Sequence, residues 1–501
     1  MIRILFALIV LAAATSAVVA NGSTDLDPDP TFGVNGIWYY PSWPVGDASE
    51  LEEYGLRVQT ELPTVGVALA NYVLTTKRYG SSPLGYTTWD AVLLKTNLAG
   101  SPDATLGNGG YVFTHTMLTA INDAVYDPGT GRAYFLGAAK MIGAANKDMA
   151  VVCLDTTTTD RKCGGWSSDS MAWIAFDLGG SNNDVGLRLF RDGNYLYVAG
   201  YADTSSGYVI AHAKLNRNTG ALVGTYGNGG KATKALGNLS SGKDQWVNSI
   251  AMSSAGSPNG KYLYFGGAYK FAANEYHGHV MEVDPATGTS DWADVSGNTS
   301  ATTESVTAVT ALANGKIAFA GISGTATTDY PDLMLGELRI NRQALGGPFF
   351  GDARFCGSGV CRKKMGPTGG VAGQFGTAHI LPLAIGERPG NRDLVVFMRG
   401  DLGLSLFSPG ETYEIVQQYD RNGFRLRAEA DIDFPAATNV TPKALLAHGS
   451  GISFWYPDTV LVVGSRYYNT LNGKIDYDPT VVQLKANDSI FADTLGGKNS
   501  D

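Results

Sequence analysis

Two histidines at alternate positions, His277 and His279, have a spacing that could bind a metal ion. Alternate residues of an extended strand point to the same side, so both imidazoles could approach one cation. A metal site needs further ligands, and no third ligand is apparent nearby in a chain with six histidines. The competing interpretation is a solvent-facing pair of loop histidines, and the sequence favours it.

Aromatic side chains gather near the N-terminus in the segment 38–43, WYYPSW. Exposed Trp and Tyr rings can stack on sugars or peptide chains, which makes Trp38, Tyr39, Tyr40 and Trp43 candidate ligand-binding residues. Half-buried packing of the same rings is the alternative, and it is the favoured one because large aromatic side chains are mostly buried.

The sequence singles out no catalytic residue. It contains neither the G-x-S-x-G nor the H-E-x-x-H motif of hydrolases. Acid pairs such as Asp431/Asp433 and Glu411/Glu414 have the groups that a glycosidase places on opposite sides of a cleft. Sequence spacing does not give distances across a cleft, so no pair is nominated.

No cofactor is predicted. The stretch GNGG occurs at 107–110 and 227–230, but each copy leads into another strand-like run, so no helix N-terminus is available to bind phosphate. A calcium ion among Asp25, Asp27 and Asp29 is left open.

The four cysteines form two local pairs, Cys153/Cys163 and Cys356/Cys361. We expect two disulfides that close short loops, as in proteins of oxidising compartments. The alternative, a zinc site, would require these distant pairs to converge.

Residues 1–20 have the layout of a secretory signal peptide. Arg3 precedes an apolar segment at 4–14, and small residues lead to a cleavage site before Asn21. This segment is too short to span a bilayer, and no later segment is long and apolar enough. We therefore expect a secreted or periplasmic protein without a transmembrane anchor.

The charge of the chain bears on its partners. The formal net charge of −9 becomes −10 when Arg3 leaves with the signal peptide. An acidic surface repels phosphate backbones, so no nucleic-acid partner is expected. A protein or glycan partner fits this charge, and a monomer is expected.

A short apolar run recurs seven times and organises the chain. Its mean spacing is about 65 residues, and no window has a sustained helical period with caps, so the fold is expected to be all-β. The first and sixth copies lack the closing glycine of the others; the seven copies are 72–76, 133–137, 196–200, 263–267, 317–321, 394–398 and 460–464.

Other strand-like runs flank each copy. The preceding runs are 65–69, 122–126, 185–190, 247–252, 306–312, 378–384 and 443–447. The following runs, which alternate apolar and polar residues, are 91–96, 149–154, 208–215, 279–283, 333–340, 413–419 and 480–484. Fourth strands after a glycine turn include 111–115, 173–178 and 231–236, whereas those of the fifth and sixth units cannot be placed.

Four antiparallel strands in each of seven units predict a seven-bladed β-propeller. Sheets stacked face to face around a ring bury faces that a single sheet would expose. The N-terminal segment 26–36 resembles the tail at 98–110, and 487–497 repeats it. We expect the segment around Ile37–Pro41 to pair next to the last unit and close the ring. The propeller would then span 21–497, with a short disordered tail at 498–501.

These tails resemble the delta-60 repeat of secreted bacterial propeller-like proteins. The resemblance is carried by 26–28 (LDP) with 31–36 (TFGVNG), by 226–230 (YGNGG) and by 314–321 (NGKIAFAG). Copies such as 291–294 and 349–351 keep little of the motif. The resemblance implies a propeller fold and export, and it implies no particular activity or catalytic residue.

Three functions fit such a chain. The favoured one is a binding or interaction module whose loops meet a ligand at one mouth of the channel. The alternative is a secreted carbohydrate-active enzyme, a lyase or hydrolase, with acids and a His or Arg at one mouth. Structural adhesion would instead place aromatic patches on the outer rim.

Overall fold

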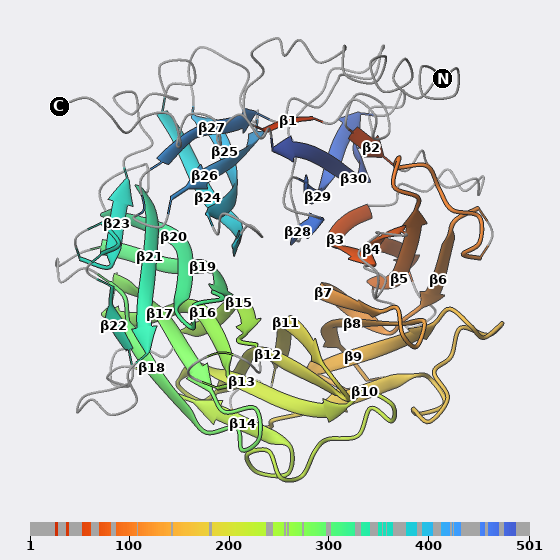
Figure 1. Ribbon diagram of the computed structural model, residues 1–501. Helices are drawn as coiled ribbons and strands as arrows, with labels where there is room; N and C mark the ends of the chain where they lie inside the picture. The colour runs from red at the N-terminus through yellow and green to blue at the C-terminus, as the bar shows by residue number, and fades with distance from the viewer. Residues whose placement is uncertain are drawn as a thin grey trace, which may run out of the picture.

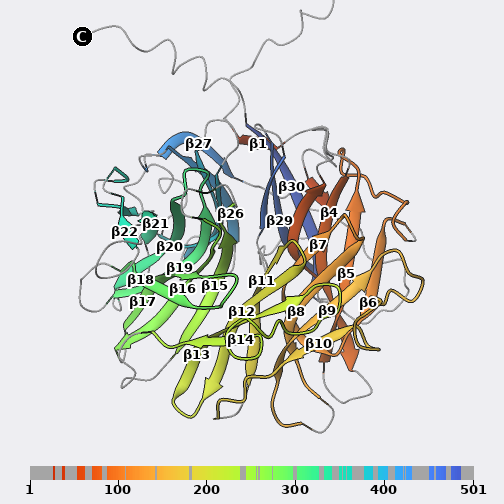
Figure 2. The same ribbon diagram turned by 60° about the horizontal axis from the view of Figure 1, so that its bottom comes forward.

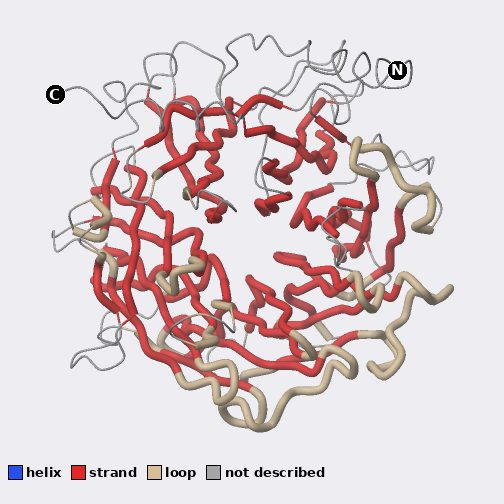
Figure 3. Tube along the Cα trace, in the orientation of Figure 1, coloured by secondary structure: helices blue, strands red, loops and turns tan. Residues whose placement is uncertain are grey.

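The computed structural model forms short β-strands joined by turns, and every element among the described residues is a strand (Figure 3). Within this part of the chain, no helix has the length and apolar character needed to cross a bilayer. The described residues are 26–28, 37–39, 53–61, 70–81, 87–107, 109–141, 144–179, 183–236, 244–254, 257, 260–272, 275–296, 302–325, 332–340, 349–352, 354–356, 358–363, 377–387, 393–403, 412–420, 423, 425–431, 451–455, 459–469 and 475–486.

Four sheets each contain four antiparallel strands in the order of the chain. Their strands are β3 (Glu53–Glu61), β4 (Ala70–Ser81), β5 (Thr87–Thr96) and β6 (Tyr111–His115); β7 (Leu118–Asp127), β8 (Arg132–Ala139), β9 (Asp148–Asp155) and β10 (Met171–Ile174); β11 (Asp184–Asp192), β12 (Tyr195–Thr204), β13 (Gly207–Asn216) and β14 (Lys231–Lys234); and β24 (Thr377–Glu387), β25 (Leu394–Gly403), β26 (Thr412–Tyr419) and β27 (Arg425–Asp431).

A nine-stranded sheet consists of two antiparallel sets. A parallel pairing of Tyr276 with Thr303 joins β17 of the first set to β19 of the second. The strands are β15 (Gln245–Met252), β16 (Leu263–Ala272), β17 (Glu275–Val283) and β18 (Ser290–Asp294); and β19 (Thr302–Ala311), β20 (Ile317–Thr325), β21 (Asp332–Ile340), β22 (Phe349–Gly351) and β23 (Val360–Lys363).

The last sheet unites the two ends of the described chain. Its strands are β28 (Gly451–Trp455), β29 (Thr459–Asn469) and β30 (Ile475–Ala486), with β1 (Leu26–Pro28) and β2 (Ile37–Tyr39) beside β30. Leu26 pairs with Ala486, and Ile37 pairs with Val482. The expected pairing of the N-terminal segment with the last unit is therefore present for 26–28 and 37–39.

The sheets stand face to face around a central opening, like the blades of a propeller (Figures 1 and 2). The strands nearest this opening, which we call the inner strands, are β3, β7, β11, β15, β19, β24 and β28 (Figure 1). Strand β28 contacts β24 on one side and β3 on the other.

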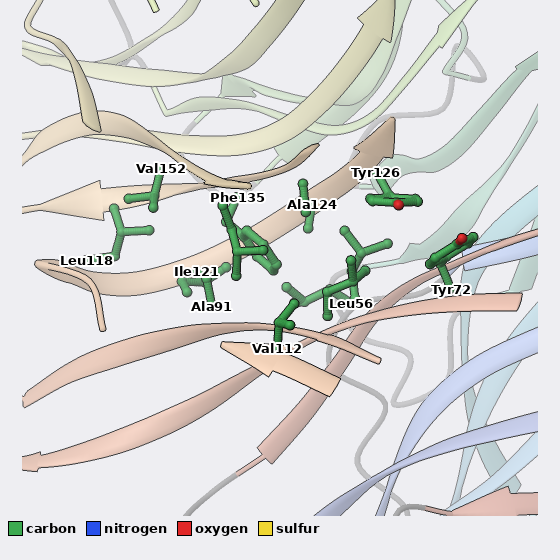
Figure 4. Packing of buried hydrophobic residues seen from close by; sticks show 14 of the residues in the cluster. Leu56, Tyr72, Ala91, Val112, Leu118, Ile121, Ala124, Tyr126, Phe135 and Val152 are labelled. Carbon is green, nitrogen blue, oxygen red and sulfur yellow. The ribbon is translucent and has the colours of Figure 1, made fainter. Parts of the chain in front are cut away.

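Apolar side chains fill the spaces between neighbouring sheets. Between β3–β6 and β7–β10, for example, Leu56 and Tyr72 pack with Ala124 and Tyr126 (Figure 4). Val58 of β3 belongs to a second cluster, which includes residues of β29 and β30 from the other end of the chain. This sharing explains why the central strands are apolar on both faces.

The predicted central strands are confirmed, because the seven apolar runs lie in β4, β8, β12, β16, β20, β25 and β29. Two of the preceding strands were wrong: β3 at 53–61, not 65–69, pairs with β4, and β28 at 451–455, not 443–447, pairs with β29. Charged residues in β3 weaken its apolar pattern, so the short apolar run 65–69 is the stronger strand signal in the sequence. Residues 62–69 and 432–450 lie outside the described part of the chain.

Each of six inner strands contains a bulge at the corresponding place. The register with the second strand of the sheet skips one residue, which leaves that residue outside the ladder. We call these residues the bulge layer; they are Leu56, Asn122, Leu187, Asn248, Thr307 and Leu383.

The bulges account for the glycine that closes most of the central strands. A Cβ atom on Gly200 would lie 1.9 Å from the carbonyl oxygen of Val185, and one on Gly137 would lie 1.7 Å from that of Ala120. A Cβ atom on Gly267 or Gly321 would likewise lie too close to a carbonyl oxygen of an inner strand. Glycine is needed there because the bulged strand brings its backbone too close for any side chain.

Candidate functional site

A cavity of about 330 Å³ lies against the inner strands, which surround the central opening. Its lining comes from six inner strands and begins at or near their bulges. We call it the channel pocket. Its lining side chains include Arg57, Asp123, Arg188, Asn122 and Asn248.

Two asparagines of the bulge layer connect neighbouring inner strands. Nδ2 of Asn122 donates to the carbonyl of Gly186, at 2.7 Å. Nδ2 of Asn248 donates to the carbonyl of Val306, at 3.0 Å, in the corresponding place two sheets further on. Both acceptors directly precede the bulge of the next inner strand. The bulge layer thus links neighbouring inner strands through hydrogen bonds from side chains to the backbone.

The residue after the bulge makes a second repeated link. The Asp123 carboxylate accepts a hydrogen bond from the Leu189 backbone N–H, at 2.8 Å. The hydroxyl of Ser249 accepts one from the Val309 N–H, at 3.0 Å. Asp123 also accepts from the N–H of Ala124, so both of its oxygens have partners.

Two arginines reach the same region of the pocket. Nη2 of Arg57 donates to Asp123 at 2.9 Å and to the carbonyl of Leu189 at 3.3 Å. Arg188 donates through Nε to the carbonyl of Asn248 and through Nη1 to that of Leu187. The pKa of Arg188 is lowered by burial; Asp123 raises it, and Arg57 lowers it further.

The described lining of the channel pocket carries a net positive charge. Among its lining residues, two arginines face one aspartate, which leaves one positive charge. Partly buried apolar side chains, Phe190, Ile250 and Met252, line the same pocket. The arrangement can bind a small anionic molecule, and among the described residues its lining holds one carboxylate instead of the pair that glycoside hydrolysis uses.

His277 and His279 both lie in β17, and they have different surroundings. The ring nitrogens of His277 contact Asp294 at 2.7 Å and Glu275 at 2.9 Å, and the Phe271 ring stacks on it. Burial lowers the pKa of His277, but the two carboxylates outweigh burial and raise it, which favours the imidazolium.

His279 is fully buried, and neither of its ring nitrogens has a hydrogen-bond partner among the residues that the structure describes. Burial lowers its pKa to about 3, so the ring is neutral. The expected solvent-facing loop pair is thus wrong, because both residues are buried in a central part of a sheet. The described residues contain no group of three potential ligands that could hold a metal ion. Metal binding by His277 and His279 stays a prediction.

The aromatic and acidic candidates lie mostly at the margins of the described chain. Trp38 and Tyr39 belong to β2, paired with Val481 and Thr480, whereas Tyr40 and Trp43 lie outside the described residues. Asp27 lies in β1, and its predicted calcium partners Asp25 and Asp29 lie outside. Glu414 and Asp431 belong to β26 and β27, and their predicted partners Glu411 and Asp433 also lie outside.

The predicted cysteine pairing is confirmed. Cys153 is bonded to Cys163 and Cys356 to Cys361, with Cα–Cα distances of 5.9 and 5.6 Å. Disulfides are typical of proteins outside the reducing cytoplasm. The predicted signal peptide at 1–20 and the tail at 498–501 lie outside the described residues.

Arg57, Asp123 and Arg188 are not among the candidate residues predicted from the sequence. Arg57 and Asp123 are 66 residues apart in the chain, and the ring brings them to 2.9 Å. The available signal was positional: each follows a bulge residue, one step further along the strand. This shared position can be recognised only once the bulges have been located in the structure.

No protein-family model and no curated protein matches this chain. Similar solved structures include the β-propeller domain of the trilobed protease from Pyrococcus furiosus, with 8% identity and a TM-score of 0.37 over 84% of this chain and 97% of that one. The GH93 α-L-arabinofuranosidase of Fusarium graminearum has 10% identity and a TM-score of 0.37, over 89% and 97%. Drosophila Plexin A has 9% identity and a TM-score of 0.33, over 88% of both chains. At such low identities and TM-scores, these similarities carry no argument about activity.

Proposed function

We propose that this chain is an exported binding module, a closed propeller of seven four-stranded blades that receives a ligand in its channel. The blade count is supported by seven central apolar strands, each with a paired inner strand. Closure is supported by the pairing of β1 and β2 with β30, and by the packing of Val58 and Val73 with Leu461. Residues 21–497 then form one domain.

The channel pocket is the observation that carries the binding function. Its polar side chains are held by hydrogen bonds from neighbouring inner strands, so they are fixed before a ligand arrives. Preorganised polar groups reduce the entropy lost on binding. The pocket's size suits a small molecule or one residue of a larger partner.

A carbohydrate-active enzyme is the alternative function. A hydrolase of the usual type needs an acid and a second carboxylate on opposite sides of the bond. Asp123 is the acidic side chain in the described pocket lining, and both of its oxygens accept backbone hydrogen bonds. This geometry favours binding over hydrolysis.

A direct comparison of binding and turnover tests this proposal. The exported chain would be screened by thermal shift against glycans, peptides and small organic acids, and the same polysaccharides would be assayed for new reducing ends or unsaturated products. We expect ligand-induced stabilisation without turnover. Turnover of a polysaccharide that is lost with an acid at a channel mouth would instead establish the enzyme.

We also propose that the protein is exported and that it is related to the delta-60 repeat proteins. The signal peptide at 1–20, the delta-60 tails and the two disulfides support a secreted or periplasmic bacterial protein. Fractionation of expressing cells, with N-terminal sequencing of the product, tests cleavage before Asn21. Light scattering after size-exclusion chromatography tests the proposed monomer.

A further inference from the structure

The two arginines of the channel pocket have hydrogen-bond donors that bond to none of the described residues. Nη2 of Arg188 makes no hydrogen bond within the described part of the chain, although Nε and Nη1 are bonded to carbonyls. Within the same residues, Nε and Nη1 of Arg57 make no hydrogen bond, and its side chain is 26% exposed. Both groups therefore have donors that a molecule in the pocket can use.

The carboxylate of Asp123 already has hydrogen-bond partners and does not accept from these remaining donors. Asp123 is 6% exposed, accepts from two backbone N–H groups and bonds Nη2 of Arg57. The described lining of the pocket thus contains two guanidinium groups and one carboxylate, which is already bonded to Arg57. A bound anion would relieve the repulsion between Arg57 and Arg188.

We propose that the channel pocket binds the carboxylate of a small organic acid, with Arg57 and Arg188 donating to it. This inference names a ligand class for the proposed binding module and rests on that function. Hydrogen bonds from a guanidinium group to a carboxylate are charge-assisted, so they are shorter and stronger than those between neutral groups. The partly buried Phe190, Ile250 and Met252 in the same lining contact the carbon skeleton, which favours an organic acid over an inorganic anion.

Hexanoate is a suitable probe because it combines a carboxylate with a short apolar chain. Isothermal titration of the full exported chain would compare hexanoate with hexanol, hexylamine and inorganic phosphate. We expect saturable one-to-one binding of hexanoate, at least about ten-fold weaker binding of hexanol, and none of hexylamine. Equal binding of all the hexyl compounds would overturn the proposal, as would phosphate binding as tightly as hexanoate.

Two variants test whether hexanoate binds in this pocket. Arg57→Gln should weaken hexanoate binding by about ten-fold or more. Asp123→Asn should tighten it several-fold, since it removes the one negative charge beside the arginines. A merely structural role of Asp123 predicts no tightening, so the opposite signs of the two effects separate binding from misfolding.

Arg191→Gln is the matched control. Arg191 also pairs with an aspartate, Asp127, and its side chain is 26% exposed like that of Arg57, but it does not line the pocket. We expect this variant to bind hexanoate like the wild type. Equal losses in Arg57→Gln and Arg191→Gln would overturn the site.

The outcomes also separate this inference from the function it rests on. If no carboxylate binds but the ligand screen yields another compound, the carboxylate proposal fails and the binding module stands. If hexanoate binds and the same chain also cleaves a polysaccharide, the site stands and the binding-only function fails.

Discussion

Asp184 and Gln245 occupy the same position in successive repeats, three residues before the bulge of β11 and of β15. The side chain of each forms hydrogen bonds with the backbone of the segment that precedes its own sheet. Asp184 accepts from the N–H of Phe176 at 2.6 Å; Gln245 accepts from the N–H of Leu236 at 2.8 Å and donates to its carbonyl at 3.1 Å. The carboxylate lacks that second donor, and Oδ1 of Asp184 is buried with no hydrogen-bond partner in the described part of the chain.

Asp184→Asn should therefore stabilise the protein in a pH-dependent way. Burial, with help from Asp148 and Asp177, raises the pKa of Asp184 from 3.8 to about 6. The folded state then binds more protons than the unfolded state, so the free energy of unfolding falls as pH rises from about 4 to 6, by about 2 kcal/mol once screening by solvent is included. We expect the variant to match the wild type near pH 4 and to exceed it at pH 7 in urea unfolding.

The exposed Asp160 supplies the control for this measurement. Asp160→Asn should leave the pH dependence unchanged. A gain from Asp184→Asn that is the same at pH 4 and pH 7 would contradict the titration of Asp184.

Gly200→Ala should destabilise the sheet β11–β14 strongly. The new methyl group would lie 1.9 Å from the carbonyl oxygen of Val185, so the bulged strand must move. The expected loss is about 3 kcal/mol in the free energy of unfolding. Gly224→Ala is the control, because a Cβ atom there meets nothing within 4 Å; similar losses at both positions would refute the role of the bulge.

His277→Gln should cost more stability at acidic than at alkaline pH. Asp294 and Glu275 raise the pKa of His277 above 6.5, so their stabilisation is fully present below 6.5 and is lost as pH rises through the folded pKa. The pairs are partly exposed, so the expected loss is about 1 kcal/mol at pH 6. Thermal unfolding at pH 6 and pH 9 measures the difference, and equal losses would show that the carboxylates do not hold the proton.

Replacing Cys153 and Cys163 together by serine should lower the free energy of unfolding by about 3 kcal/mol. The disulfide closes a loop with a sequence separation of 10, which limits the entropy of the unfolded chain. Urea unfolding of the double variant tests this. The wild type under reducing conditions should show at least this loss, since reduction also opens Cys356–Cys361.

The central strands were predictable because burial on both faces gives an uninterrupted apolar run, as in 196–200. The pairing of Ile37 with the last sheet followed from the matching tails at the two ends of the chain. The bulges were not predictable, because one extra residue in a short strand changes the alternation of side chains without interrupting its apolar character. The channel pocket depends on those bulges, so Arg57 and Arg188 could not be brought together from sequence spacing alone.

The bulge layer also limits which insertions and deletions the repeats can accept during evolution. Since one added residue exchanges the two faces of a strand, losing it would turn the rest of that strand inside out, so that Arg188, for example, would leave the channel. The residue type at the bulge differs from one repeat to another, as Leu187 and Asn248 show. Insertions and deletions should therefore collect in the turns, while the residue count across each bulge stays fixed.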